Sequence, residues 1–181
     1  MSDEAPENAV RTAGSRLELA PALHRWSVRA RASEHAALEH LFGVTLPVEH
    51  LRSSTSEQGS ALWLGPDEWL VLMPPHAATG FRRRYIADGG AALPCSAVDI
   101  THRNVGVRLG GAAAQSVLNA GCPLDLAPAA FPPGACTRTL FGKAEIVLWR
   151  LEESQPEFHI ECWRSFLPYL WQRLRTAADE N

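Results

Sequence analysis

The sequence predicts an α+β fold with two side-by-side split β-α-β halves, each built on an antiparallel sheet. Two observations predict this fold. The order strand, helix, hairpin, helix occurs in residues 25–87 and again in residues 105–177. Apolar residues alternate at period two in the expected strands, and they recur at spacings of three and four in the expected helices. With 181 residues, the chain has the length of one domain or of two fused small halves.

The first residues differ in composition from the rest of the chain. Residues 1–15 are mostly polar, which predicts a disordered tail. We expect residues 16–181 to form a single α+β domain. Its first half spans about residues 20–90 and its second half about residues 96–177.

The first half combines a half-buried strand, two helices and a hairpin. The expected elements are a strand over 25–32, a helix over 34–41, strands over 61–64 and 69–73, and a helix over 76–87. Ser33 is a good N-cap for the first helix, and Gly43 is expected to stop it. The turn-forming quartet Gly65-Pro66-Asp67-Glu68 between two apolar strands predicts the hairpin. Phe81 and Tyr85, four residues apart, are expected to meet on the second helix.

The second half repeats this order. The expected elements are a strand over 105–109, a helix over 112–119, strands over 136–141, 145–151 and 158–163, and a helix over 166–177. Gly111 stands at a strand-to-helix corner, and Gly121 is expected to end the short helix in the left-handed conformation. Ser165 is the expected cap of the last helix, whose apolar stripe has helical spacing. That stripe is Leu167, Leu170, Trp171 and Leu174.

Composition argues against several classes of function. The net charge of -3 provides no field that favours nucleic acid or anionic lipid. No window approaches the roughly 18 apolar residues of a membrane span, and residues 1–14 lack the apolar core of a signal peptide. We therefore expect a cytoplasmic protein that binds neither nucleic acid nor membrane. The four cysteines form no CxxC pair and are expected to be buried free thiols: Cys95, Cys122, Cys136 and Cys162.

Two glycine motifs fail the tests for nucleotide binding. Gly142-Lys143 resembles the end of a phosphate loop, but Thr137 stands where a Gly is needed and Ala144 where a Ser or Thr holds magnesium. Residues 106–111 lack the G-x-G-x-x-G spacing of a dinucleotide fingerprint. The histidines show no metal-ligand spacing with nearby Cys or carboxylates.

Asp99, Thr101 and His102 are the nearest approach to a nucleophile with acid–base partners. Such groups must converge in space, and neighbours along one chain rarely do so. The favoured interpretation is a turn in which Asp and Thr satisfy backbone donors. A partner contact or a small-ligand site is the alternative.

Four segments resemble the gamma subunit of bacterial heterotetrameric sarcosine oxidase, in the same order and with matching spacing. They are residues 61–74, 98–126, 131–150 and 158–174, within a likeness that covers about residues 20–177. The resemblance implies a non-catalytic accessory subunit of a complex that oxidatively demethylates sarcosine to glycine. That complex produces hydrogen peroxide and a one-carbon unit bound to tetrahydrofolate.

The resemblance also implies where the cofactors and partners lie. FAD, NAD and a covalent FMN belong to the alpha and beta subunits, and zinc belongs to the delta subunit. We expect no catalytic, cofactor-binding or metal-binding residue in this chain. The isolated chain is expected to be inactive and to pack on the alpha, beta and delta subunits, mainly on alpha.

A more distant resemblance, carried by residues 105–150, is to the folate-binding domain of the aminomethyltransferase of the glycine cleavage system. In that family, acidic residues of the corresponding hairpin help to hold folate. This chain has Lys143-Ala144-Glu145 there, with one carboxylate and no Asp pair. The alternative function is therefore a stand-alone, folate-like small-molecule binding module in one-carbon metabolism. A free-standing structural protein is a third class.

Two polar turns are the candidate partner interface. One consists of Thr101, His102, Arg103 and Asn104, and the other is the hairpin tip with Pro66, Asp67 and Glu68. Both lie within segments that carry the family resemblance, and packing does not explain polar turn residues. Arg103 is the best single candidate, because a guanidinium makes two parallel bonds to a carboxylate. The alternative is that these side chains only cap their own turns.

Overall fold

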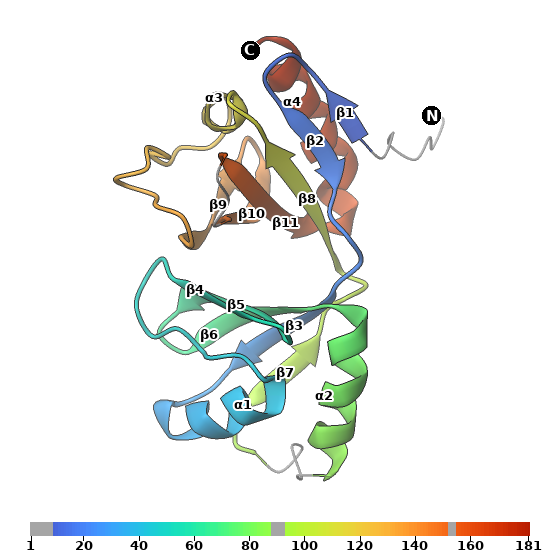
Figure 1. The fold of residues 1–181 in the computed structure, drawn as a ribbon, viewed down its shortest axis with the longest axis vertical. Coiled ribbons are helices and arrows are strands. Elements are labelled where there is room, and N and C mark those ends of the chain that lie inside the picture. Colours follow the sequence, from blue (N-terminus) through green and yellow to red (C-terminus); the bar gives the residue numbers. More distant parts are fainter. Residues whose placement is uncertain (1–8, 88–92, 152–154) are drawn as a thin grey trace. The chain divides into compact units, whose positions relative to one another are not determined.

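The computed structural model describes residues 9–87, 93–151 and 155–181 (Figure 1). The chain divides into two compact units. The terminal unit comprises Met1–Pro21 and Arg103–Asn181, and the central unit comprises Ala22–His102. Each unit contains one antiparallel sheet together with helices. The predicted α+β class with two antiparallel sheets is confirmed.

The central unit has a five-stranded sheet in the order β4-β5-β6-β3-β7. Its strands are β3 (His24–Arg29), β4 (Ser53–Ser56), β5 (Gly59–Gly65), β6 (Glu68–Met73) and β7 (Ser96–Asp99); its helices are α1 (His35–Phe42) and α2 (Pro75–Ala87). Both helices pack on the same face of this sheet, because their buried residues share one cluster with Val28 and Trp69. Phe42 of α1 stacks on Phe81 of α2, with ring centroids 4.5 Å apart. The predicted pair of Phe81 and Tyr85 also forms.

The terminal unit has a six-stranded sheet in the order β1-β2-β8-β11-β10-β9. Its strands are β1 (Ala9–Arg11), β2 (Arg16–Leu19), β8 (Asn104–Gly110), β9 (Cys136–Phe141), β10 (Ala144–Arg150) and β11 (Glu157–Trp163); its helices are α3 (Ala114–Asn119) and α4 (Leu167–Asp179). Leu109, Phe158 and Ile160 are buried on the apolar face of this sheet. The predicted stripe of α4 is buried at Leu170, Trp171 and Leu174.

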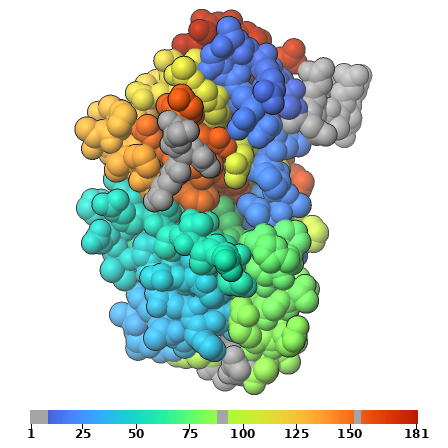
Figure 2. Space-filling model, viewed as in Figure 1, coloured from blue at the N-terminus to red at the C-terminus, as the bar shows by residue number. Residues whose placement is uncertain are grey.

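A hairpin forms in residues 9–19, where the sequence predicted a disordered tail up to residue 15. Residues 1–8 lie outside the described residues, but β1 pairs with β2 through a turn in which Thr12 and Ser15 bond to each other. Figures 1 and 2 show this hairpin at the surface of the terminal unit. β2 then joins the sheet by pairing with β8. The pairing partner lies about 90 residues away in the chain, so local composition does not reveal this strand.

The two predicted hairpins are confirmed. β5 and β6 pair through the Pro66-Asp67 turn, and β9 and β10 pair through Gly142-Lys143. One strand of the expected second half belongs elsewhere: Ser96–Asp99 form β7 and pair with β3 in the central unit.

Three expectations about the helix ends are wrong. Neither Ser33 nor Ser165 caps a helix, because a 3₁₀ turn precedes α1 and another precedes α4. Each 3₁₀ turn continues directly into the helix that follows it. The Ser33 side chain does not cap α1, and its Oγ donates a hydrogen bond to Glu34 Oε1. Gly121 does not adopt positive φ. A Cβ at Gly121 would lie 3.0 Å from the Phe141 ring, so close packing against this ring favours glycine here.

Gly111 occupies the predicted strand-to-helix corner between β8 and α3. Its φ of 111° lies in the region that favours glycine. A Cβ at this position would lie 2.5 Å from the carbonyl oxygen of Gly14. Both the backbone conformation and the neighbouring chain therefore require glycine.

We predict that Gly111→Val destabilises the protein by about 2 kcal/mol or more, because a β-branched residue is strained at this φ and collides with Gly14. Lys143→Ala, in an exposed hairpin turn, serves as the control and changes stability by less than about 0.5 kcal/mol. Thermal denaturation of the two variants measures the difference. Equal melting temperatures, or the reverse order, contradict the assignment of the corner.

Candidate partner interface

The first half of the candidate turn is held by its own hydrogen bonds. The backbone N–H of Thr101 donates to Asp99 Oδ1 at 2.9 Å, and Thr101 Oγ1 accepts from the N–H of Arg25 at 2.9 Å. Burial alone raises the pKa of Asp99, but hydrogen bonds from Thr101 and the charges of Arg82 and His24 lower this pKa below its ordinary value. Asp99 and Thr101 thus stabilise the local fold.

The second half of this turn is more exposed. His102 and Arg103 lie at the surface, while Asn104 is buried at the start of β8. Arg103 Nε donates to Asn104 Oδ1 at 3.1 Å. Its guanidinium carbon also lies 5.7 Å from the centroid of the Trp163 ring. Within the described part of the chain, no carboxylate lies within ion-pair distance of Arg103.

The hairpin tip shows a similar mixture. Pro66 and Asp67 are exposed. Glu68 is partly buried, and its Oε2 accepts from Arg29 Nη2 at 2.8 Å. The carbonyl of Asp67 accepts from the N–H of Ala30 at 3.1 Å. Two of the candidate residues are therefore also tied to β3 and the residue after it.

Thr101 of the first turn and Glu68 of the hairpin tip lie at opposite ends of β3. Thr101 bonds to Arg25 near the start of the strand, and Glu68 lies opposite Arg29 at its end. Four residues of strand span about 13 Å. A partner that contacts both turns has to extend along the sheet of the central unit.

A surface cluster that the turn prediction missed lies beside Arg103. We call Arg103, Trp163 and Phe166 the aromatic corner. Trp163 is 46% exposed and Phe166 is 37% exposed, and their ring centroids are 6.2 Å apart. Trp163 follows Glu157, His159 and Glu161 at every second position of β11, so it shares their face of the strand rather than that of Phe158. The sequence therefore contained a signal for Trp163.

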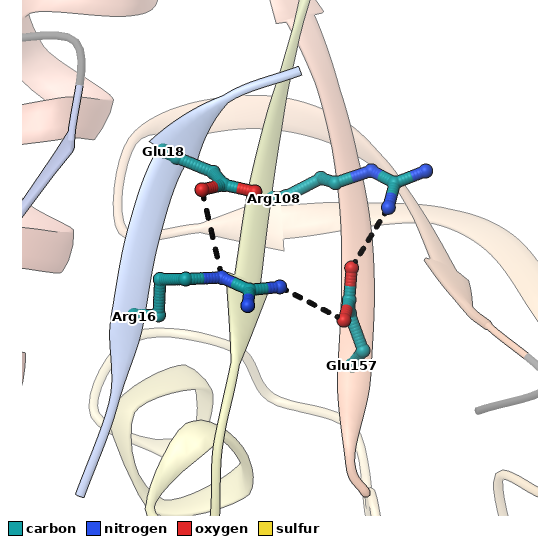
Figure 3. Close-up of polar contacts among 4 residues, drawn as sticks. All are labelled: Arg16, Glu18, Arg108 and Glu157. Atoms are coloured by element: carbon teal, nitrogen blue, oxygen red, sulfur yellow. Dashed lines mark hydrogen bonds and ion pairs between the residues drawn. The ribbon is translucent and has the colours of Figure 1, made fainter. Parts of the chain in front are cut away.

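That same face of the terminal sheet carries a charged network (Figure 3). Glu157 of β11 accepts from two arginines, Arg16 of β2 at 3.1 Å and Arg108 of β8 at 2.9 Å. Arg16 Nε also lies 3.5 Å from Glu18 Oε2. Each oxygen of the Glu157 carboxylate has its own guanidinium, so the network ties three strands together and its charges balance.

A buried pair lies further along β11. His159 Nε2 is 2.7 Å from Glu161 Oε1, and the two residues are 2% and 1% exposed. On the neighbouring strand β8, a Cβ at Gly106 would lie 2.8 Å from Glu161 Oε1. A histidine–carboxylate pair is part of the hydrolase triad, but this one is closed off from solvent. The geometry fits a structural role.

The remaining candidates for chemistry are also engaged or shielded. None of the four cysteines forms a disulfide in the described structure, and burial, together with the charge of Glu34, raises the pKa of Cys95. A raised pKa keeps the thiol protonated and weakens it as a nucleophile. Among the described residues, no group of three or more His, Cys, Asp or Glu is arranged to hold a metal ion. Nor does any described helix have the length and apolar character needed to cross a bilayer.

The hairpin corresponding to the folate-binding one does not fit folate. Its single carboxylate, Glu145, is exposed, and Glu145 Oε1 lies 3.8 Å from Arg138 Nε on the adjacent strand. The acidic pair that the distant resemblance requires is missing from Lys143-Ala144-Glu145.

The family model described as "Sarcosine oxidase, gamma subunit family" matches residues 28–180. The chain belongs to this family. It is 34% identical over 120 residues to a sarcosine oxidase subunit gamma from Arthrobacter sp, covering 66% of this chain and 58% of that protein. It is 35% identical over 122 residues to the one from Corynebacterium sp. (strain P-1), covering 65% and 57%. The matched stretch thus spans less than two thirds of these relatives.

A solved structure shares the fold of this family member. A chain of the heterotetrameric sarcosine oxidase from Corynebacterium sp. U-96, in complex with pyrrole 2-carboxylate, matches with a TM-score of 0.80. The sequence identity is 27%, and the match covers 92% of this chain and 84% of the other. The family resemblance predicted from the sequence is confirmed. These findings favour a gamma subunit over a stand-alone folate-like module.

We predict that acid destabilises this protein partly through Asp99. A carboxyl whose folded pKa is lowered stabilises the fold above its unfolded pKa of about 3.9, and this stabilisation is lost as the pH falls through the folded value. Asp99→Asn keeps the acceptor for Thr101 but removes the titration, so its stability should fall less steeply below about pH 5. Urea denaturation at several pH values measures the slope, with exposed Asp67→Asn as the control. An unchanged slope contradicts the prediction.

We also predict that the buried pair is coupled. His159→Leu removes the imidazole that bonds to Glu161 Oε1 in the interior and should cost about 3 kcal/mol or more. The double variant with Glu161→Leu should cost less than the sum of the two single changes, because each single change already breaks the bond between these side chains. Exposed His50→Leu is the control, and chemical denaturation gives all the values. A double variant as unstable as both single changes added together shows that the pair is uncoupled.

Proposed function

We propose that this chain is a non-catalytic accessory subunit of a heterotetrameric sarcosine oxidase. In this proposal the complex oxidatively demethylates sarcosine to glycine, with hydrogen peroxide and a tetrahydrofolate-bound one-carbon unit as the other products. The observation that carries the proposal is the structural match over 92% of the chain to a chain of such a heterotetramer. The fold of one chain of that heterotetramer is thus retained over nearly the whole chain.

The arrangement of ionisable groups supports a role without chemistry. The carboxylate of Glu157 is bonded by two arginines, and the pair of His159 and Glu161 is sealed from solvent. Proton transfer or nucleophilic attack needs a reactive group that a substrate can reach. As the family resemblance implies, FAD, NAD and a covalent FMN belong in this proposal to the alpha and beta subunits, and zinc belongs to the delta subunit.

The partners in this proposal are the alpha, beta and delta subunits, mainly alpha. The two polar turns, Thr101 to Asn104 and Pro66 to Glu68, are the proposed contact regions. Within them, His102, Arg103, Pro66 and Asp67 have exposed surface to offer. We propose a cytoplasmic location, since cysteines that form no disulfide in the described structure suit a reducing compartment.

The assembly experiment tests the proposal. The tagged chain is co-expressed with the alpha, beta and delta subunits of the same organism, and the purified material is analysed by size-exclusion chromatography and mass spectrometry. We expect all four chains to elute together and to oxidise sarcosine. Elution of this chain alone, while the other three assemble into an active enzyme, contradicts the proposed function.

A second prediction concerns the isolated chain. Purified alone, it should show no flavin absorbance and no sarcosine oxidation, because its sequence has no dinucleotide fingerprint and the residues that the structure describes form no convergent acid–base site. The co-expressed complex, measured in parallel, provides the positive control for both readings. Stoichiometric flavin on the isolated chain contradicts the assignment of flavin to other subunits.

A further inference from the structure

The aromatic corner is the strongest unpartnered feature of the terminal unit. Of the large apolar side chains that the described structure leaves exposed, Trp163 and Phe166 are the aromatic ones, and their rings meet edge to face. Neither side chain belongs to the core of the unit. Tryptophan is enriched at the centres of protein interfaces, where its large ring is removed from water.

Arg103 is held in place beside these rings. Its Nε is bonded to Asn104, which is only 6% exposed, and its guanidinium lies over Trp163. The N–H of Arg164 donates to the carbonyl of Arg103 at 2.8 Å, which ties the end of β11 to this turn. A side chain fixed before binding loses little rotamer entropy when a partner arrives.

The donors that remain on Arg103 define what it recognises. With Nε occupied by Asn104, the two terminal nitrogens are left to form a parallel pair of bonds with one carboxylate. No carboxylate of the described chain lies within ion-pair distance of Arg103. The corner thus combines an unmatched positive charge with exposed aromatic area.

We propose that the aromatic corner docks an acidic segment of a partner subunit of the oxidase. An Asp or Glu side chain of that segment is held end-on by Arg103, and a neighbouring apolar side chain covers Trp163 and Phe166. Charge complementarity selects this occupant, since Arg103 is positive and no carboxylate of the described chain lies within ion-pair distance of it. A nucleic acid needs more positive charge than a chain of net charge -3 provides. This inference rests on the proposed function.

Binding of the full-length chain to the purified alpha–beta–delta assembly tests the inference. We expect Trp163→Ala to weaken binding about 30-fold or more, the loss that marks an interface hot spot. Arg103→Ala should weaken it to a similar extent at low salt and less at high salt, because salt screens its ion pair. Arg103→Lys retains the charge without the fork and should lose about tenfold.

Matched variants separate binding from folding. Leu140→Ala removes an apolar side chain that is 48% exposed on β9 of the same sheet, and Arg173→Ala removes an exposed arginine of α4. Both should bind like the unchanged chain. Melting temperatures of all variants are measured in parallel. If Trp163→Ala does not fold, Phe166→Ala provides the test of the apolar contact.

The outcomes distinguish this inference from the proposed function. Loss of binding by Trp163→Ala and Arg103→Ala, with unchanged melting temperatures, supports the docking site. Normal binding by both variants overturns it and leaves the accessory-subunit function intact. Failure of the unchanged chain to bind overturns the proposed function and the inference with it. Dimerisation of the isolated chain that Trp163→Ala abolishes, in sedimentation measurements, identifies a second copy as the occupant and also overturns it.

Discussion

The close approach of neighbouring chain segments to β8 is the constraint on which the terminal unit depends. A Cβ on Gly106 would lie 2.8 Å from Glu161 Oε1 on one side and 2.9 Å from Ala20 Cβ on the other. At the end of the strand, Gly111 leaves room for the carbonyl of Gly14. Because these positions carry no side chain, β2 and β11 both pair with β8. Strands from residues 9–19 and from residues 104–163 thereby share one sheet.

Local signals explain which parts of this fold could be predicted. Both hairpins were predicted because two apolar runs flank a turn, and the interaction closes within a few residues. The pairing of β7 with β3 and of β2 with β8 joins segments that are far apart in sequence, and periodicity says nothing about partners. The contact between Arg16 and Glu157 spans 141 positions in the sequence. Ser33 and Ser165 are suitable cap residues, but 3₁₀ turns before the helices changed the positions that need a cap.

The candidate interface was predictable to a similar degree. Turn chemistry correctly identified a polar segment whose Arg103 is exposed. It did not reveal the distance along β3 that separates Thr101 from the hairpin tip. Trp163 was not singled out from the sequence. In the structure Trp163 lies opposite Asn104 and follows the polar positions of β11. The alternation along this strand therefore contained the signal for the residue.

The distribution of charged contacts connects the fold to an accessory role. Enzyme sites keep reactive groups accessible and often leave them incompletely satisfied. Here Asp99 is held by the turn that follows it, and Glu157 is shared by two arginines. The pair of His159 and Glu161 is closed off from solvent. The interactions of these groups hold strands and turns together. Arg103 and Trp163 differ from them, because part of their binding capacity is still exposed once the chain has folded. This division between satisfied interior charges and a partly exposed edge supports the proposed role of a subunit that contributes surface rather than chemistry.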